Sequence, residues 1–330
     1  MHQQATGRRR FLLSMGALGA AGMASCAQTD SRSGAAIAYD PKAGFELEVN
    51  EVEYRRTPKG RALMARIYRP RGAGPFPVVL DLHGGAWNTK DRMAEQPMDR
   101  AIASSGALVV AIDLTLAPES PYPANVQDAN FAVRWLKSKA RQWGGDPVTL
   151  GVYGSSSGGH VAELLGMRPT DARYNAIALE GAPNVDAVVS YVATRSPISD
   201  TFARYQNAEQ RKRASLIKSS RTYFNPWETV HEANPQEILE RREKAMLVPL
   251  LVMQGALDDN LLPAVQERFV NTYRTAGGKV SYSVFENSIH DWVQEPSPQT
   301  TRAQEMVKAF IAEQLAARRR TSTTDLIRSS

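Results

Sequence analysis

Residues 148–165 read VTLGVYGSSSGGHVAELL: a β-like apolar run, a turn of glycine and serine, and a helix-like segment. The turn contains the pattern G-x-S-x-G with Ser156 at its centre. A serine on a sharp strand-to-helix turn needs small residues two places to either side, because a Cβ there would collide with the turn. The same pattern also occurs in ordinary loops, so the rest of the chain decides what it means.

Apolar runs alternate with helix-like segments along the chain. The runs expected to form strands are 46–52, 63–68, 78–82, 107–112, 148–153, 187–192, 247–253 and 280–285, and helices are expected over 126–143 and 301–317. Two hairpin-like strands followed by buried runs predict an antiparallel edge that leads into a parallel sheet. The alternation predicts an α/β fold with helices on both faces of a mostly parallel sheet.

The 330 residues are 42% hydrophobic, which suffices for one α/β domain with a sizeable core. We expect this catalytic domain to cover residues 45–318 and to be followed by a flexible tail over 319–330. Strand periodicity disappears between about 195 and 246, where charged and aromatic residues take its place. An insertion of that length between two strands predicts a helical cap.

The first 25 residues predict an export signal. Arg8, Arg9 and Arg10 precede a short apolar stretch over 11–24, a twin-arginine-like start. Met23-Ala24-Ser25-Cys26 resembles a bacterial lipobox, and Cys26 is the only cysteine in the chain. We therefore expect lipidation at Cys26, a tether over 26–44, and a lipid anchor in the cell envelope as the only membrane attachment. An ordinary signal peptide with an incidental cysteine is the alternative.

The net charge of +6 includes the three arginines of this segment, and removal of the segment would leave about +3. That balance does not favour a nucleic-acid partner. The sequence indicates neither a metal nor an organic cofactor, and it leaves the oligomeric state open.

A serine nucleophile needs a base, and the chain contains five histidines. Four are placed badly for this role: His2 in the signal, His83 in a glycine turn, His160 on the helix after Ser156, and His231 in the cap. His290 follows the last predicted strand and precedes the closing helix. It is the predicted base.

Two carboxylates, Asp258 and Asp259, follow the predicted strand over 247–253. The carboxyl ends of the strands in a parallel sheet are where α/β folds place their ligand-binding and active sites. We choose Asp258 as the acid that orients His290 and expect Asp259 to cap the next helix. The resulting chain order, serine then acid then histidine, is the order of an α/β-hydrolase.

The turn after the strand over 78–82 reads His83-Gly84-Gly85-Ala86-Trp87. Glycines let backbone N–H groups approach a substrate, so Gly85 and Ala86 are predicted oxyanion donors together with Ser157, while Gly84 either contributes or only permits the bend. Trp87 is expected to wall the substrate pocket, as are Trp227 and Trp292. A purely structural packing role for these tryptophans stays open.

Several motifs together resemble the hormone-sensitive-lipase-like α/β-hydrolases, and among these the bacterial acetyl and feruloyl esterases. They are His83 to Trp87, Leu116 to Ala124, Gly154 to Gly159, Gly255 to Asp258, and His290. The resemblance covers about residues 45–318. It departs from the family at Ala86, where a third glycine is usual and the H-G-G-x-W form of kynurenine formamidases is matched instead. It also departs at Ser155, where an acidic residue is usual.

These observations predict a serine carboxylester hydrolase that works through an acyl-enzyme on a small acyl or aryl ester. The resemblance implies acetylated or feruloylated carbohydrate as one possible substrate. An amidase, formamidase or peptidase with the same triad is the alternative. A non-catalytic envelope lipoprotein is a second one, disfavoured by the intact Ser156, Asp258 and His290.

Overall fold

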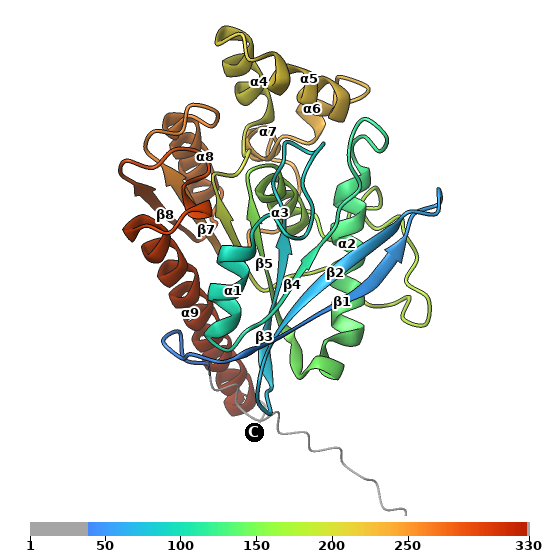
Figure 1. Ribbon diagram of the computed structural model, residues 1–330, viewed down its shortest axis with the longest axis vertical. Coiled ribbons are helices and arrows are strands. Elements are labelled where there is room, and N and C mark those ends of the chain that lie inside the picture. The colour runs from blue at the N-terminus through green and yellow to red at the C-terminus, as the bar shows by residue number, and fades with distance from the viewer. Residues whose placement is uncertain (1–38, 329–330) are drawn as a thin grey trace, which may run out of the picture. The chain divides into compact units, whose positions relative to one another are not determined.

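The computed structural model describes residues 39–328, so the predicted export signal, Cys26 and most of the predicted tether lie outside the described residues. Eight strands form one sheet in the order β1-β2-β4-β3-β5-β6-β7-β8 (Figure 1). The strands are β1 (Leu47–Arg56), β2 (Ala62–Pro70), β3 (Phe76–Leu82), β4 (Leu108–Ile112), β5 (Gly145–Ser155), β6 (Val192–Arg195), β7 (Leu250–Gly255) and β8 (Val280–Phe285).

The antiparallel edge is confirmed. Strand β1 pairs with β2, and β2 pairs with β4, both antiparallel, whereas every pair from β4 onward along the sheet is parallel. Strands β3 and β4 are buried along their whole length. Continuous apolar runs are typical of parallel strands that are covered on both faces.

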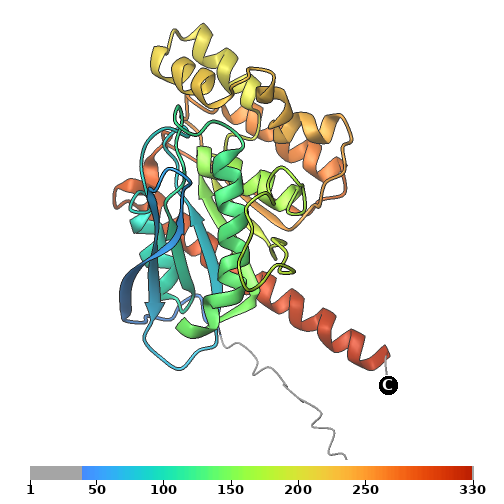
Figure 2. The same ribbon diagram turned by 90° about the vertical axis from the view of Figure 1, so that its right-hand side faces the viewer.

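Helices cover both faces of the sheet (Figures 1 and 2). They are α1 (Gln96–Ser104), α2 (Ala124–Lys139), α3 (Ser157–Met167), α8 (Pro263–Thr275) and α9 (Pro298–Arg328). Residues of α1 and α9 share one apolar cluster with one set of strand side chains, and residues of α2, α3 and α8 share the other cluster with the opposite set. Within residues 39–328, no helix combines the length and the apolar character that crossing a membrane requires.

The segment between β6 and β7 is helical, at the top of Figure 1. We call its helices the cap: α4 (Thr201–Gln210), α5 (Ala214–Tyr223), α6 (Thr229–Glu232) and α7 (Pro235–Glu240). The cap follows the carboxyl end of β6, so it leaves the sheet at the edge where the predicted nucleophile lies.

The predicted boundaries differ most from the structure at two elements, the sixth strand and the last helix. The sixth strand covers Val192–Arg195 and not 187–192, because Val192 is the first residue in register with Val152 of β5 and Leu250 of β7. Ala187 and Val189 are buried in the core without joining the ladder, so their apolar character carried no strand information. The last helix continues to Arg328, through residues expected to form a tail.

Candidate active site

Ser156 lies between the end of β5 and the start of α3, as its glycine pattern predicted. Its φ of 50° and ψ of −117° are a strained conformation for a residue with a side chain. A Cβ on Gly154 would lie 2.6 Å from the Gly158 carbonyl oxygen, and one on Gly158 would lie 1.9 Å from the Leu82 carbonyl oxygen. The two glycines therefore permit the sharp turn that presents Ser156.

The structure brings the three predicted triad residues together from three different strand ends. The Oγ of Ser156 lies 3.0 Å from Nε2 of His290, and Nδ1 of His290 lies 2.8 Å from Oδ2 of Asp258. Because a carboxylate only accepts hydrogen bonds, Nδ1 carries the proton and Nε2 is the acceptor for the serine hydroxyl. This arrangement can deprotonate Ser156 during nucleophilic attack.

Asp258 is buried, and its environment stabilises the carboxylate. Oδ1 accepts hydrogen bonds from the backbone N–H groups of Asn260, at 3.0 Å, and Leu261, at 2.9 Å. Burial opposes ionisation of Asp258, but the hydrogen bond and charge of His290 and the Leu261 N–H outweigh it and lower the carboxyl pKa. Asp258 can thus stay ionised while it orients His290.

Asp259 has a different role from the one that we expected. Helix α8 begins at Pro263 with Leu262 before it, so Asp259 does not cap that helix. Its carboxylate instead pairs with Arg213 of the cap and lies 3.8 Å from Arg211. The two neighbouring acids therefore diverge, Asp258 toward the histidine and Asp259 toward the cap.

The predicted oxyanion turn lies against the nucleophile. A Cβ on Gly84 would lie 3.3 Å from Cβ of Ser156, and Gly85 has a φ of 106° at which an added Cβ would lie 2.2 Å from the Thr89 carbonyl oxygen. Ala86 also has a positive φ, of 51°. No described residue accepts a hydrogen bond from the N–H of Gly85 or Ala86.

Ser157 completes this set of donors. It is the first residue of α3, where a backbone N–H has no intrahelical acceptor. Its hydroxyl accepts a hydrogen bond from the Trp87 N–H at 3.2 Å, which ties the oxyanion turn to the nucleophile turn. The N–H groups of Gly85, Ala86 and Ser157 can therefore serve a developing oxyanion.

Ser155, the predicted departure from the family pattern, contacts an acid that the sequence analysis did not find. Its hydroxyl donates to Oε1 of the buried Glu95 at 2.6 Å. Glu95 also pairs with the buried Arg195, at 3.1 Å, and Arg195 donates to the His290 carbonyl oxygen at 2.7 Å. Glu95 is thus linked to both the nucleophile turn and the histidine loop, across a sequence separation that no local pattern reveals.

His83 and His160 are both buried and stand apart from the triad. His83 Nδ1 lies 2.7 Å from the Gly84 carbonyl oxygen, so His83 braces its own loop. His160 Nε2 donates to the Ala233 carbonyl oxygen at 2.7 Å, and Nδ1 accepts from the Trp87 indole at 3.2 Å. Burial lowers the pKa of His160 to about 4, so it is neutral at pH 7.

A cavity of about 320 Å³ opens beside Ser156. Its lining residues are Gly84, Gly85, Ala86, Lys90, Ser155, Ser156, Arg195, Arg204, Arg213, Ser215, Leu216, Asp259, Asn260, His290 and Asp291. A volume of this size suits a small ligand. Polar and charged side chains predominate in the lining.

The three tryptophans predicted to wall the pocket are not among these lining residues. Trp87 is buried and stacks on Tyr223, with ring centroids 4.6 Å apart. Trp227 packs on Tyr205 in the cap, and Trp292 stacks on Phe285 beneath the histidine loop. All three contribute to packing, the alternative that the sequence left open.

Within residues 39–328, no group of three or more histidine, cysteine, aspartate or glutamate side chains is arranged to hold a metal ion. The candidate site described above comprises the triad, the oxyanion turn and the polar cavity.

The sheet, the helices on its two faces and the serine, histidine and acid at its carboxyl edge define an α/β-hydrolase. Residues 66–272 match the model of the BD-FAE family, and the chain belongs to this family. The resemblance found in the sequence motifs is thereby confirmed.

Two of the curated relatives come from Mycobacterium tuberculosis. The probable carboxylic ester hydrolase LipM is 29% identical over 212 residues, which cover 61% of this chain and 46% of LipM. Carboxylesterase NlhH is 36% identical over 125 residues, which cover 38% of this chain and 37% of NlhH. The matched region thus spans less than half the length of these two relatives.

Solved structures show the same fold. Esterase B from Lactobacillus rhamnosis superposes with a TM-score of 0.70 at 20% identity, covering 86% of this chain and 90% of that one. Esterase Est2 from Thermogutta terrifontis, with propionate bound, gives a TM-score of 0.63 at 20% identity, covering 82% and 94%. These likenesses extend over nearly the whole described domain.

Proposed function

We propose that this protein is a serine carboxylester hydrolase that acts through an acyl-enzyme on small acyl or aryl esters. The observation that carries the proposal is the chain of contacts from Ser156 through His290 to Asp258, facing a turn with free N–H groups. The names of LipM and NlhH, both ester hydrolases, support the same activity. Acetylated or feruloylated carbohydrate is the substrate class suggested by the sequence motifs.

The first half of the reaction transfers the acyl group to the enzyme. His290 Nε2 takes the proton of Ser156 as its Oγ attacks the ester carbonyl carbon. The carbonyl oxygen gains negative charge and accepts hydrogen bonds from the N–H groups of Gly85, Ala86 and Ser157. One such donor contributes about 10²- to 10³-fold in rate. His290 then protonates the leaving alcohol.

The second half regenerates the enzyme. A water gives its proton to His290 and attacks the acyl carbon, and the same N–H groups stabilise the second tetrahedral intermediate. Ser156 leaves with the proton from His290, and the carboxylic acid is released. Asp258 keeps the imidazole in the required tautomer during both halves.

The test is hydrolysis of p-nitrophenyl acetate and butyrate by the full chain, with Ser156→Ala as the variant. We expect the variant to lose about 10⁴-fold or more in kcat. Labelling with the organophosphate paraoxon adds a second readout, because a single adduct on Ser156 is expected by tandem mass spectrometry. Equal rates in the two proteins would overturn the proposal, and so would an adduct on Ser155 or Ser157.

Ser157→Ala is the matched control. It keeps the backbone N–H and removes only the hydroxyl that accepts from Trp87. We expect this variant to keep the paraoxon adduct and to stay within about tenfold of the parent kcat. A panel of N-formyl amides and short peptides tests the amidase and peptidase alternatives, and faster turnover of an amide than of its matching ester would favour them.

We also propose that the protein is exported and lipid-anchored at Cys26, as the twin-arginine-like start and the lipobox-like residues suggest. Expression with a radiolabelled fatty acid in a bacterial host tests this. Label in the parent protein and none in Cys26→Ser is the expected result, and an unlabelled parent would overturn the proposal.

A further inference from the structure

The active-site cavity contains one buried arginine without a carboxylate partner. Arg204 belongs to cap helix α4, is 3% exposed, and lines the cavity together with Ser156 and His290. Its guanidinium carbon lies 5.2 Å from the ring centroid of Trp87, the last residue of the oxyanion turn. The positive charge is thus buried and belongs to a residue that lines the cavity.

The hydrogen bonds of Arg204 leave part of the guanidinium unused. Nη1 donates to the Ser220 hydroxyl at 2.8 Å, and Nε donates to Oδ1 of Asn260 at 3.3 Å. Nη2 is buried and has no acceptor among the described residues. Burial lowers the pKa of Arg204 to about 10, so the group is still charged at pH 7.

The other two arginines that line the cavity each have a carboxylate partner. Arg195 pairs with Glu95, and Arg213 pairs with Asp259. For Arg204, no ion pair with a carboxylate exists within residues 39–328, and its pKa is shifted by burial alone. A buried charge without a partner is costly for a fold. Its retention in a cavity next to a nucleophile indicates that a ligand supplies the partner.

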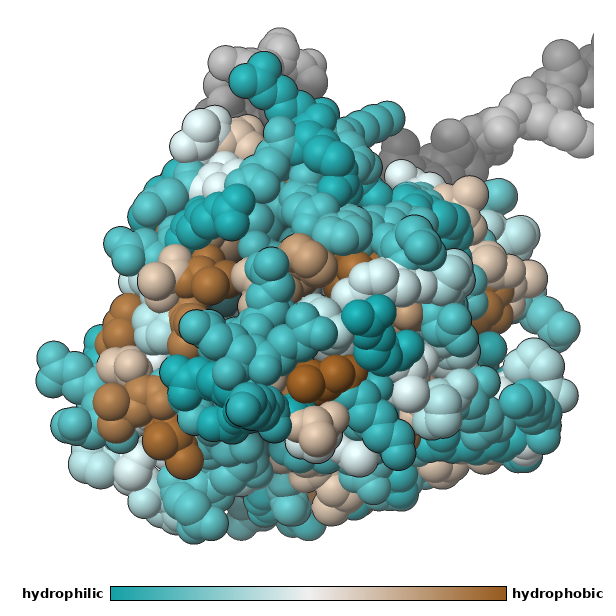
Figure 3. Space-filling model, turned by 90° about the horizontal axis from the view of Figure 1, so that it is seen from above, coloured by the Kyte–Doolittle hydropathy of each residue, from teal (hydrophilic) through white to brown (hydrophobic). Residues whose placement is uncertain are grey.

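The cavity as a whole favours an anion. Four basic side chains and two acidic ones line it, and the exposed Lys90 at its edge makes no ion pair with any described residue. The face of the molecule over the cap is mostly hydrophilic, with separate apolar patches (Figure 3).

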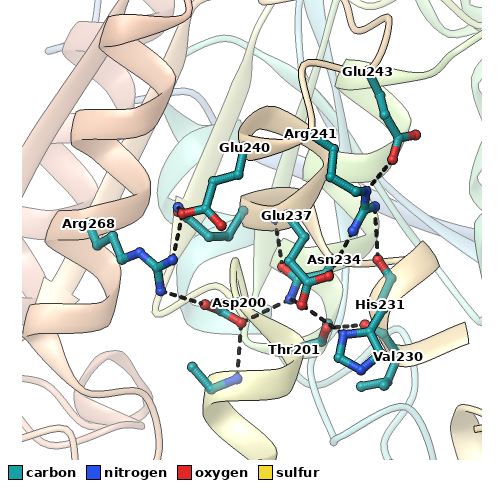
Figure 4. A network of polar contacts seen from close by, with 12 residues as sticks. Asp200, Thr201, Val230, His231, Asn234, Glu237, Glu240, Arg241, Glu243 and Arg268 are labelled. Atoms are coloured by element: carbon teal, nitrogen blue, oxygen red, sulfur yellow. Dashed lines mark hydrogen bonds and ion pairs between the residues drawn. The ribbon is translucent and has the colours of Figure 1, made fainter. Parts of the chain in front are cut away.

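The cap holds Arg204 in place. Asp200 caps α4 by accepting from the Ala203 N–H at 3.0 Å, and it also accepts from Asn234 Nδ2 at 2.9 Å (Figure 4). Arg268 of α8 lies 3.6 Å from the other oxygen of Asp200. These contacts fix the start of α4 to α7 and α8, one turn from Arg204, so the guanidinium is preorganised for a ligand.

We propose that Arg204 is a substrate-binding residue that pairs with a carboxylate on the ester, so that this enzyme prefers anionic esters over neutral ones. The proposal rests on the proposed ester hydrolysis and adds the chemical class of its substrate. The carboxylate belongs either to the acyl part, as in a half-ester of a dicarboxylic acid, or to the alcohol part, as in an acylated hydroxy acid. A neutral substrate would leave Arg204 buried and unpaired, and such sites discriminate strongly.

Matched substrates test the preference without any mutation. For the acyl side, monoethyl succinate, glutarate and adipate are each compared with the ester in which the free carboxylate is a primary amide. For the alcohol side, 4-acetoxybutanoate is compared with 4-acetoxybutanamide. We expect kcat/KM at pH 7.5 to be at least about 30-fold higher for the carboxylate than for the amide on one of the two sides. Ratios near one on both sides would overturn the proposal.

Arg204→Gln then assigns the preference to this residue. We expect it to lower kcat/KM for the preferred carboxylate ester at least about 30-fold and for the amide less than about threefold. Arg204→Lys keeps the charge on a shorter group and should give an intermediate loss. Arg221→Gln is the control, since Arg221 also stacks on an aromatic ring of the cap, 3.9 Å from Trp227, but does not line the cavity. Equal losses for both substrates in Arg204→Gln would show a structural role and overturn the proposal.

Different results would contradict the proposed ester hydrolysis and the proposed role of Arg204. Hydrolysis of p-nitrophenyl acetate without any anion preference would contradict only the role of Arg204. If no ester is hydrolysed, calorimetry with monoethyl glutarate and 4-acetoxybutanoate decides the matter. Binding to Ser156→Ala but not to the Ser156→Ala, Arg204→Gln double variant supports the anion site, and absence of binding to the single variant overturns it. If Arg204→Gln does not fold, the carboxylate-to-amide ratio of the parent protein decides alone.

Discussion

The carboxyl edge of the sheet and the cap are held together by different kinds of contact. At the sheet edge, backbone turns directly after β3, β5 and β7 position the oxyanion turn, Ser156 and Asp258. In the cap, side chains from distant segments hold one another, as in the network around Asp200 (Figure 4). The backbone positions of the oxyanion turn, Ser156 and Asp258 thus follow from local turns, whereas the positions of the cap helices depend on long-range side-chain contacts.

The largest expected effect separates the two neighbouring acids that face these two regions. Asp258→Asn removes the charge that orients His290, and we expect kcat on p-nitrophenyl acetate to fall about 10⁴-fold. Asp259→Asn only weakens a pair with Arg213 in the cap, and it should change kcat less than about tenfold. If the two variants lost similar activity, the division between sheet edge and cap would be wrong.

The lowered pKa of Asp258 also predicts that the stability of the protein depends on pH. The native pKa of Asp258 is lowered, so its stabilising contribution is present above the unfolded value of 3.8 and is lost as the pH falls through the lower native value. Urea unfolding at pH 7 should therefore show a stability difference between the parent and Asp258→Asn that shrinks below about pH 4. A difference that stays constant from pH 7 to pH 3 would contradict this assignment.

A smaller effect is expected for the hydrogen bond between Ser155 and Glu95 at the sheet edge. Ser155→Asp restores the acid that is usual in the family, but here it places a second carboxylate against Glu95. We expect kcat to fall about 10- to 100-fold and the free energy of unfolding to fall by about 3 kcal/mol, because buried like charges repel. The double variant Ser155→Asp, Glu95→Gln has a single carboxylate beside Arg195 and should recover most of both losses. A double variant worse than the single one would show that Glu95 acts independently of Ser155.

The next largest expected effect is on stability, and it concerns the hydrogen bond that joins the sheet region to the cap. His160 of α3 bonds the Ala233 carbonyl of the cap and is neutral in the native state. Because its pKa is lowered from 6.5 to about 4, the unfolded chain binds the proton first, and stability is lost as the pH falls from 6.5 toward 4. We expect this loss to reach about 2–3 kcal/mol in urea unfolding. His160→Gln should lose less over the same range, and an unchanged slope would exclude His160 as the cause.

The smallest effect concerns α1, which packs on the face of the sheet opposite α2 and α3. Both carboxylate oxygens of Asp99 are buried without a partner, and burial, followed by the charges of Asp81 and Glu95, raises its pKa well above 3.8. Stability is therefore full below the unfolded pKa and is lost as the pH rises through the native one. Asp99→Asn should be more stable than the parent by about 1–2 kcal/mol at pH 9 and nearly equal to it at pH 4. Activity on p-nitrophenyl acetate serves as the control and should change less than about twofold.

Most of the sheet could be predicted because parallel strands buried on both faces are continuous apolar runs, as in β3 and β4. The sixth strand was predicted too early in the chain because Ala187 and Val189 are apolar and buried, although they do not pair with a neighbouring strand. The triad followed from Ser156, Asp258 and His290 each lying just after a predicted strand. The aromatic character of a residue does not separate a tryptophan that packs from one that lines a cavity, and none of the three predicted tryptophans lies among the residues that line the cavity beside Ser156.

The sequence by itself determined which residues make up the candidate triad and the oxyanion turn, because strand ends and turns are local and their glycine, serine and acid patterns are readable within a few residues. Only the tertiary structure decided which charges meet there. Glu95 reaches Ser155 from 60 residues away, Asp259 pairs with Arg213, and Nη2 of Arg204 has no acceptor among the described residues. Pairing of side chains depends on distances across the fold, and those distances do not appear in any local pattern of residues.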